Sequence, residues 1–431
     1  MDPLAHTLFG ATMAEAGLRR KTALATGTLI IGANIPDVDA VAMLISADYA
    51  LQVRRGWTHG ILALMIWPFL LTGAMLAVDR LLQRRRGRRD RAPSASTRTT
   101  DSRSTGPPPD TGTMPRSSET RATLKRQSAS SRKSGPNFSH GMTQSLPMRP
   151  GVLLGIAFLG VWSHPLLDWL NTYGIRLLMP FDDTWFYGDT LFIIDPWVWL
   201  LAGAGVVLAR SESWPGIGGW IVLGTALTAL VTTADMVPLG AKIIWVAGIA
   251  AIVLVRWTGW HRDAAQPVAL SLLVAVVLYM AFMFAGARLT VWHARSQLSA
   301  DGIEAGQVMA NPLPARLLLR TGVAASETHY YRFRVNWMRP GSFEFDGEPV
   351  PIEPPDRIVE AALRSPDVQG LRNWMRFPAY EVRQMDDGWQ VFIRDLRYVP
   401  PEEESPAGIG MAVVDLDEEL RVIAPTRSPS Q

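Results

Sequence analysis

Residues 61–82 read ILALMIWPFLLTGAMLAVDRLL, an apolar run in which Asp79 and Arg80 are the only charged residues. A helix needs about 20 such residues to cross the hydrocarbon core of a bilayer. Three more runs have nearly the same length, at 216–234, 239–257 and 268–287. The four runs predict membrane-spanning helices.

Four other apolar segments are shorter, and they cover residues 4–18, 22–35, 151–163 and 196–209. Each is either a short span or a re-entrant helix beside a polar cavity. We therefore expect an α-helical polytopic membrane protein with about six to eight membrane segments. No basic leader precedes the first apolar segment, so no cleavable signal peptide is expected.

The basic residues indicate the orientation. Five arginines follow Leu82 within seven residues, and such clusters stay on the cytoplasmic side of a membrane. Residues 83–149 hold fifteen Lys or Arg against four Asp or Glu, whereas the whole chain has a net charge of only +3. The basicity is thus a topology signal and predicts no nucleic-acid partner. We expect a multi-pass protein of the bacterial cytoplasmic (inner) membrane, with the lipid bilayer as its partner.

Composition divides the chain into four parts. Residues 1–82 and 150–287 hold the membrane segments. Residues 83–149, which include His140, are rich in Ser, Thr, Arg and Pro, so a disordered cytoplasmic loop is expected there. Residues 288–431 contain YYRFRVNW at 330–337 and WQVFIR at 389–394, whose aromatic and β-branched residues predict a soluble, β-rich, non-cytoplasmic domain.

Several ionisable residues lie near the ends of membrane segments, where such groups are costly and therefore candidates for function. They are His6, Asp37, Asp39, His59, His164, Asp168, Asp189 and Asp195. If all eight segments cross the membrane, the His/Asp motifs fall on the non-cytoplasmic side together. The chain has no cysteine, so oxygen and imidazole are its available metal ligands. The location of the His/Asp motifs on one side of the membrane predicts one shared polar site.

The spacing of these residues suits a metal ion. His164 and Asp168 share one face of a helix, although Pro165 favours His164 as the cap of a new helix. Pro36 is expected to end the preceding helix and to leave Asp37 and Asp39 extended around an ion. Imidazole with carboxylate suits zinc, iron or manganese, and several carboxylates allow two ions. A bound ion lowers the pKa of water to roughly 7, which supports hydrolysis.

Simpler roles compete with metal binding. A histidine on a membrane helix such as His6 can hydrogen-bond between helices. The Asp37–Asp39 pair can form a turn or cap, and Asp195 before Pro196 is typical of an N-cap, with Asp189 equally weak as a site residue.

The remaining polar residues also have two readings. Arg54 and Arg55 can bond backbone at the membrane surface or hold an anionic substrate group. Asn171 and Tyr173 are either partners of the site or helix-end residues. No motif surrounds the three remaining histidines, which are His261, His293 and His329.

The motifs, taken in order, resemble a known family. They are Met1-Asp2-x-x-x-His6, Ile35-Pro36-Asp37-x-Asp39, Arg55-Gly56-x-Thr58-His59, His164-x-x-x-Asp168-x-x-Asn171-x-Tyr173-Gly174, and Gly188-Asp189 to Asp195-Pro196. This order is similar to that of the YdjM-like family of membrane-bound, metal-dependent hydrolases, over about the first 200 residues.

The resemblance implies a divalent metal, zinc or manganese, and a presumed set of ligands. Carried over by position, these ligands are His6, Asp37, Asp39, His59, His164 and Asp168. Two positions depart from the family pattern, because Arg54 replaces a histidine and Gly60 replaces a serine. The first departure removes one imidazole.

Together these features predict a metal-dependent hydrolase at the outer face of the membrane, acting on a phosphoester or lipid-linked substrate. Asp37 or Asp168 would take the proton of the attacking water, and Arg54 or Arg55 would hold an anionic group. The alternative is a scaffold or regulator whose His/Asp cluster is structural. A transporter is less favoured, because the polar groups lie at span ends and the spans show no inverted repeat.

Overall fold

The computed structural model describes residues 1–90, 146–210, 213–339, 341–402 and 409–423. The predicted basic loop at 83–149 falls mostly outside these residues, together with His140. Its first residues continue a helix as far as Asp90. The expected disorder of the loop lies outside the described part of the chain.

All eight apolar segments of the sequence are helical. The helices are α1 (Pro3–Glu15), α2 (Ala25–Gly32), α4 (Ile61–Asp90), α5 (Pro150–Trp169), α6 (Pro196–Arg210), α7 (Trp214–Thr233), α8 (Leu239–Thr258) and α9 (Ala265–Ala300). Within the described residues, five are long and apolar enough to span a membrane, namely α4, α5, α7, α8 and α9. A sixth span results if α2 is counted with η2 (Ile35–Leu44), to which it is joined at a 45° bend.

Two expectations about local structure were wrong. Pro165 lies inside α5 and starts no new helix, so His164 and Asp168 belong to one continuous helix. A proline removes one backbone donor, and neighbouring groups can satisfy the freed carbonyls in a membrane helix. Pro36 leaves no extended segment, because it lies in the first turn of the 3₁₀ helix η2, where its missing N–H has little cost. Asp37 and Asp39 therefore sit on a helical turn.

Small residues bring α2 and α5 into close contact. A Cβ atom on Gly160 would lie 3.2 Å from the carbonyl oxygen of Leu29, and one on Gly32 would lie 3.2 Å from the backbone of Gly160. Glycines allow this approach because the backbones can meet without side chains between them. The contact places the end of α2 against the middle of α5, shortly before Asp37 of η2 and His164 of α5 along the chain.

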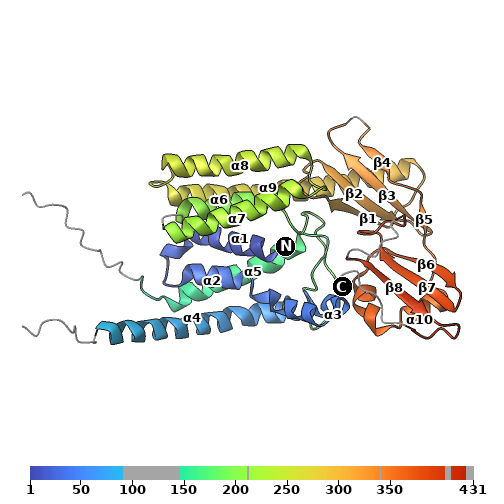
Figure 1. Ribbon diagram of the computed structural model, residues 1–431, viewed down its shortest axis with the longest axis horizontal. Coiled ribbons are helices and arrows are strands. Elements are labelled where there is room, and N and C mark those ends of the chain that lie inside the picture. Colours follow the sequence, from blue (N-terminus) through green and yellow to red (C-terminus); the bar gives the residue numbers. More distant parts are fainter. Residues whose placement is uncertain (91–145, 211–212, 340, 403–408, 424–431) are drawn as a thin grey trace, which may run out of the picture. The chain divides into compact units, whose positions relative to one another are not determined.

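The C-terminal part contains two antiparallel sheets (Figure 1). The first has the order β1 (Gln307–Pro312), β2 (Leu319–Ala325), β3 (His329–Asn336), β4 (Phe343–Phe345), with β5 (Val350–Pro351) also paired to β3. The second has the order β6 (Pro378–Met385), β7 (Gly388–Asp395), β8 (Met411–Leu416). The short helices are η1 (Leu18–Arg20), α3 (Ala47–Val53), α10 (Arg357–Ala362), η3 (Pro366–Val368) and α11 (Gln369–Trp374).

The helical and β-rich parts meet through packed side chains. Helix α9 runs on to Ala300, past the predicted end of its span at 287, and packs against β1 and β3 (Figure 1). Helix α11 packs against α3. Tyr173, which follows α5, is buried in the same apolar cluster as Trp374 and Leu371. The chain is thus a polytopic helical membrane protein with a C-terminal β-rich part, as expected from the sequence.

Candidate metal centre

Three segments that are distant in sequence bring four polar residues together. Asp37 comes from η2, His59 precedes α4, and His164 and Asp168 lie one turn apart on α5. One ligand atom from each of these four residues lies within 4.8 Å of the others. The sequence predicted this convergence from the order of the helices.

Each of the two histidine nitrogens lies within 3.7 Å of the other three atoms. The Nε2 atoms of His59 and His164 are 3.0 Å apart. Asp37 Oδ1 lies 3.7 Å from each of these nitrogens. Asp168 Oδ2 lies 3.4 Å from His59 Nε2 and 3.5 Å from His164 Nε2. Ligands about 2.0–2.1 Å from a tetrahedral zinc ion are about 3.3 Å from one another, which is close to these separations.

The other ring nitrogen of each histidine faces an oxygen. His164 Nδ1 lies 2.7 Å from the carbonyl oxygen of Ala33, which can only accept, so this nitrogen carries the proton. His59 Nδ1 lies 3.3 Å from Asp39 Oδ2 and 2.9 Å from Thr58 Oγ1. A proton on Nδ1 leaves the Nε2 of a neutral imidazole as an acceptor. Two lone pairs then face each other at 3.0 Å, an arrangement that a cation between them would stabilise.

The surroundings of the group also suit a cation. His59, His164 and Asp168 are fully buried, and Asp168 Oδ2 pairs with Arg55 Nε at 2.9 Å. The same oxygen lies 3.4 and 3.5 Å from the two histidine nitrogens, where a cation would add to the compensation that a buried carboxylate needs. Two imidazoles and two carboxylates are a ligand set that zinc or manganese accepts.

Asp39 stands outside the four-atom group and contacts it through His59. Its Oδ2 accepts hydrogen bonds from Thr58 Oγ1 at 2.6 Å and from the backbone N–H of Arg55 at 3.0 Å. A carboxylate beside the distal nitrogen of a metal-binding histidine fixes the orientation of the ring and raises its basicity. This geometry favours an orienting role for Asp39, whereas the sequence predicted a ligand.

His6 also lies beside the group. Its Nε2 is 3.2 Å from Asp168 Oδ1, and its ring stacks on that of His164 with centroids 3.9 Å apart. The amino group of Met1 contacts the same Oδ1 atom. His6 is fully buried, and its Nδ1 has no hydrogen-bond partner among the described residues. The structure therefore places His6 against Asp168, next to the four-atom group.

Arg55 is tied to the protein on all sides. Its Nε and Nη2 lie 2.9 and 3.0 Å from the two oxygens of Asp168, while Nη1 donates to Asn171 Oδ1 at 2.9 Å and to the carbonyl of Gly174 at 3.2 Å. The residue has a left-handed backbone (φ 53°) and is 1% exposed. A strained backbone persists where its surroundings hold it firmly. Arg55 is thus placed to orient Asp168. It has no exposed face for a substrate anion, so the interpretation that it binds an anionic substrate group does not fit the structure.

Arg54 differs from its neighbour because it remains partly exposed. Its Nη2 donates to Asp37 Oδ1 at 3.2 Å, and its side chain is 14% exposed, as is Asp37 at 10%. Arg54 and Asp37 therefore form the more open side of the group.

The order of these residues along the chain is that of a known family. The family described as YdjM inner membrane protein matches residues 1–240. The chain belongs to this family. The match contains every residue of the four-atom group, and it confirms a multi-pass inner membrane protein. Searches of curated proteins and of solved structures give no significant match.

The β-rich part of this YdjM-family chain lies beyond the matched residues, yet it contacts the turn that follows α5. Asn171 is fully buried and accepts from Arg55, and the ring of Tyr173 stacks under the guanidinium of Arg55 at 4.4 Å. The structure thus favours the interpretation of Asn171 and Tyr173 as partners of the site over that of simple helix-end residues. Thr58 was not predicted, although its place directly before His59 was a signal. The carbonyl of Ala33 gives no signal in the sequence.

Asp189 and Asp195 lie apart from the four-atom group. Asp189 pairs with Arg376 at 2.8 Å. Asp195 caps α6 by accepting from the N–H groups of Trp197 and Val198, and it also accepts from the hydroxyl of Tyr279. The cap reading of Asp195 therefore fits the structure. The other described histidines have partners elsewhere: His261 bonds the Val255 carbonyl, His293 bonds Ser342, and His329 bonds Thr328.

The carboxylates around His59 favour a positive charge, either a proton or a metal ion, between its Nε2 and that of His164. Burial lowers the pKa of His59, but the interactions with Asp168 and Asp39 outweigh this, so the pKa is raised above its ordinary value. The same negative surroundings that attract a proton also attract a metal cation.

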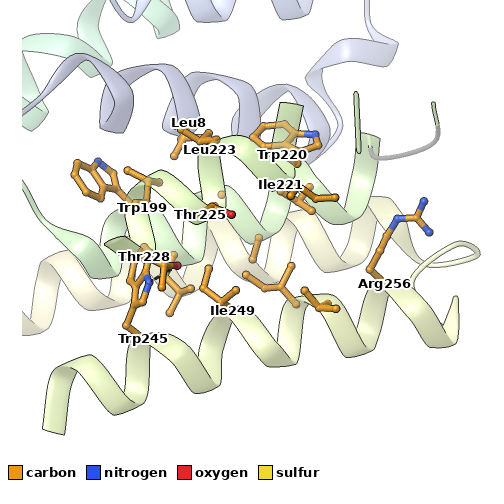
Figure 2. Close-up of a pocket in the computed structure, with 18 of the residues that line it drawn as sticks. Leu8, Trp199, Trp220, Ile221, Leu223, Thr225, Thr228, Trp245, Ile249 and Arg256 are labelled. Atoms are coloured by element: carbon orange, nitrogen blue, oxygen red, sulfur yellow. Dashed lines mark hydrogen bonds between the residues drawn. The ribbon is translucent and has the colours of Figure 1, made fainter. Parts of the chain in front are cut away.

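A separate apolar cavity of about 620 Å³ lies among α6, α7 and α8 (Figure 2). Trp199, Trp220 and Trp245 line it, with Arg256 at one end. None of the four His/Asp residues is among its described lining residues. The cavity is therefore no part of the candidate metal centre.

Proposed function

We propose that this YdjM-family protein is a divalent-metal-dependent hydrolase. The observation that carries the proposal is the pair of facing Nε2 atoms of His59 and His164, with a carboxylate oxygen of Asp37 and one of Asp168 within 3.7 Å of both. His59, His164, Asp37 and Asp168 would hold the ion. A bound zinc or manganese ion supplies a water of lowered pKa and a Lewis acid.

The residues around the ion have separate tasks in this proposal. Asp37 is on the more open side and accepts the proton of the attacking water. Asp168 is buried, so Arg55 fixes its orientation, and Asp39 does the same for His59. Orienting partners of this kind maintain metal affinity and activity.

A lipid-linked phosphoester is the substrate class that the surroundings support. Arg54, next to Asp37, is the cation best placed to hold a phosphate oxygen on the open side. The outer side of η2 exposes Val41, Leu44 and Ile45, and Leu44 is 88% exposed. An apolar surface on the segment that carries Asp37 suits a substrate that remains in the bilayer.

One observation favours the alternative, a scaffold with a structural cluster. Arg55 pairs with both oxygens of Asp168, and Arg54 pairs with Asp37, so each carboxylate already has a cationic neighbour. A structural cluster would need no metal. The two proposals differ in whether the purified protein retains an ion.

The experiment is metal analysis of the full-length protein purified in detergent. We expect about one divalent ion per chain in the wild type and its loss in the double variant His59→Ala/His164→Ala. His329→Ala removes an imidazole that hydrogen-bonds Thr328 Oγ1 in the β-rich part, and it should keep the ion. Hydrolysis of p-nitrophenyl phosphate and of phosphatidic acid vesicles should follow metal content. An unchanged ion content in the double variant would exclude the site.

A further inference from the structure

We propose that the C-terminal β-rich part acts as a positioning element for the metal centre, by holding the segments on either side of Arg55. The inference rests on the proposed metal site. It concerns residues 366–398, which lie outside the part of the chain that matches the family. No role for this part follows from the family.

The first contact is with the turn after α5. Trp374 donates its indole N–H to the carbonyl of Tyr173 at 2.9 Å, and Arg397 Nη1 donates to the carbonyl of Thr172 at 2.8 Å. The hydroxyl of Tyr398 donates to Thr172 Oγ1 at 3.2 Å. Three side chains of the β-rich part therefore end on two adjacent residues of one turn.

Arg397 is itself firmly held. Its guanidinium pairs with Asp395 at 2.7 Å, and both side chains are fully buried. It also donates to the carbonyl of Trp374. A buried ion pair whose remaining donors are satisfied has one defined geometry. The position of the Thr172 carbonyl is thus fixed by a rigid partner.

The turn after α5, positioned by these contacts, in turn holds the side chain of Arg55. Arg55 donates to Asn171 Oδ1 and to the carbonyl of Gly174, and its guanidinium lies 4.4 Å over the ring of Tyr173. Two further rings pack on that of Tyr173, Trp374 at 4.9 Å and Trp185 at 5.9 Å between centroids. Trp374, Tyr173 and Arg55 therefore form a continuous stack from the β-rich part to Asp168.

The second contact is with α3, on the other side of Arg55. The carboxylate of Asp48 accepts from the backbone N–H groups of Gly370 and Leu371 at 2.9 Å each. Helix α3 ends at Val53, directly before Arg54 and Arg55. The β-rich part therefore holds Arg55 from two sides. It contacts α3, which leads into Arg55, and it contacts the turn that the Arg55 side chain touches.

The position of Arg55 sets the orientation of the Asp168 carboxylate. Arg55 contacts both of its carboxylate oxygens, so a shift of Arg55 changes the direction of Asp168 Oδ2 toward His59 and His164. Loss of such outer partners typically weakens metal binding about 10–100-fold. Trp374, Arg397 and Asp48 are positioning residues in this scheme and touch no metal.

The test measures the dissociation constant for Zn²⁺ and the absorption spectrum with Co²⁺ in the full-length protein. The variant Trp374→Phe/Tyr398→Phe removes two hydrogen bonds to the turn and keeps aromatic packing. Asp48→Asn is a second variant, at the contact with α11. It tests the same inference if the double variant at Trp374 and Tyr398 does not fold. We expect each to raise the dissociation constant about tenfold or more and to alter the Co²⁺ spectrum.

The matched control is Trp337→Phe, which removes an indole hydrogen bond to Thr290 Oγ1 within the same C-terminal part. It should leave the dissociation constant within twofold. Equal effects in the control and the two variants, or wild-type affinity in all three, would overturn the inference while the proposed function stands. A wild type that binds no Zn²⁺ would instead overturn the proposed function.

Discussion

At the scale of single residues, Asp37 and Asp39 show how two carboxylates of one motif acquire different roles. Both lie on η2, but Asp37 Oδ1 faces the Nε2 atoms of His59 and His164, whereas Asp39 Oδ2 faces His59 Nδ1. One would therefore bind the ion and the other would orient a ligand. Their spacing in the sequence does not distinguish them.

This difference predicts unequal effects of the same substitution. We expect Asp37→Asn to weaken Zn²⁺ binding more than Asp39→Asn, because only the first removes a charged ligand. Asp39→Asn should cost about 10–100-fold, the usual effect of an orienting partner. Isothermal titration of both variants measures the ratio. Equal losses, or a larger loss for Asp39→Asn, would contradict the assignment.

At the scale of elements, the contact between α2 and α5 positions the site. Gly32 and Gly160 let the two backbones approach, and this brings the Ala33 carbonyl to 2.7 Å from His164 Nδ1. That contact fixes which nitrogen of His164 is free to bind an ion. The helix packing and the chemistry of the site are therefore linked.

A larger side chain at this contact should separate the helices. Gly160→Leu would meet the Leu29 backbone, so we expect both a lower melting temperature and weaker Zn²⁺ binding. Gly155→Leu is the matched control on α5, because a Cβ there has no atom within 4 Å. Thermal unfolding and Zn²⁺ titration of both variants test this. A control as damaged as Gly160→Leu would count against the contact.

At the scale of the whole molecule, the orientation of the helices in the membrane determines on which side the candidate site lies. The arginines that follow Leu82 predict a cytoplasmic end for α4 and thus a four-atom group on the outer side. If all eight apolar segments cross the membrane, the β-rich part is predicted to lie on the outer side as well. The absence of cysteine makes this orientation easy to test.

Single cysteines should report the two sides. We expect Asp386→Cys, at an exposed turn between β6 and β7, to react with a membrane-impermeant maleimide on intact spheroplasts. Arg84→Cys, near the cytoplasmic end of α4, should react only after permeabilisation. The cysteine-free wild type is the control for background labelling. The reverse pattern would place the site on the cytoplasmic side.

Much of the architecture could be predicted because membrane insertion is a local property. Each run of about 20 apolar residues, as at 61–82, is long enough to span hydrocarbon whatever surrounds it. The His and Asp motifs next to these runs likewise predicted one shared group, since the alternation of spans places their ends together. The local conformations around Pro36 and Pro165 were wrong, because neighbouring helices determine whether a proline ends a helix or is tolerated.

Hydropathy and the order of the motifs were enough to predict the helical membrane architecture and the His/Asp residues of the candidate site. The different places of these residues follow from tertiary contacts, which put Asp37 and Asp168 beside the two histidines, Asp39 behind His59, and Arg55 behind Asp168. The reason is physical: hydropathy depends on composition along the chain, whereas the direction of a carboxylate depends on contacts between distant segments. For Asp168 those contacts pass through Arg55 and Tyr173 to Trp374, about 200 residues further along the chain.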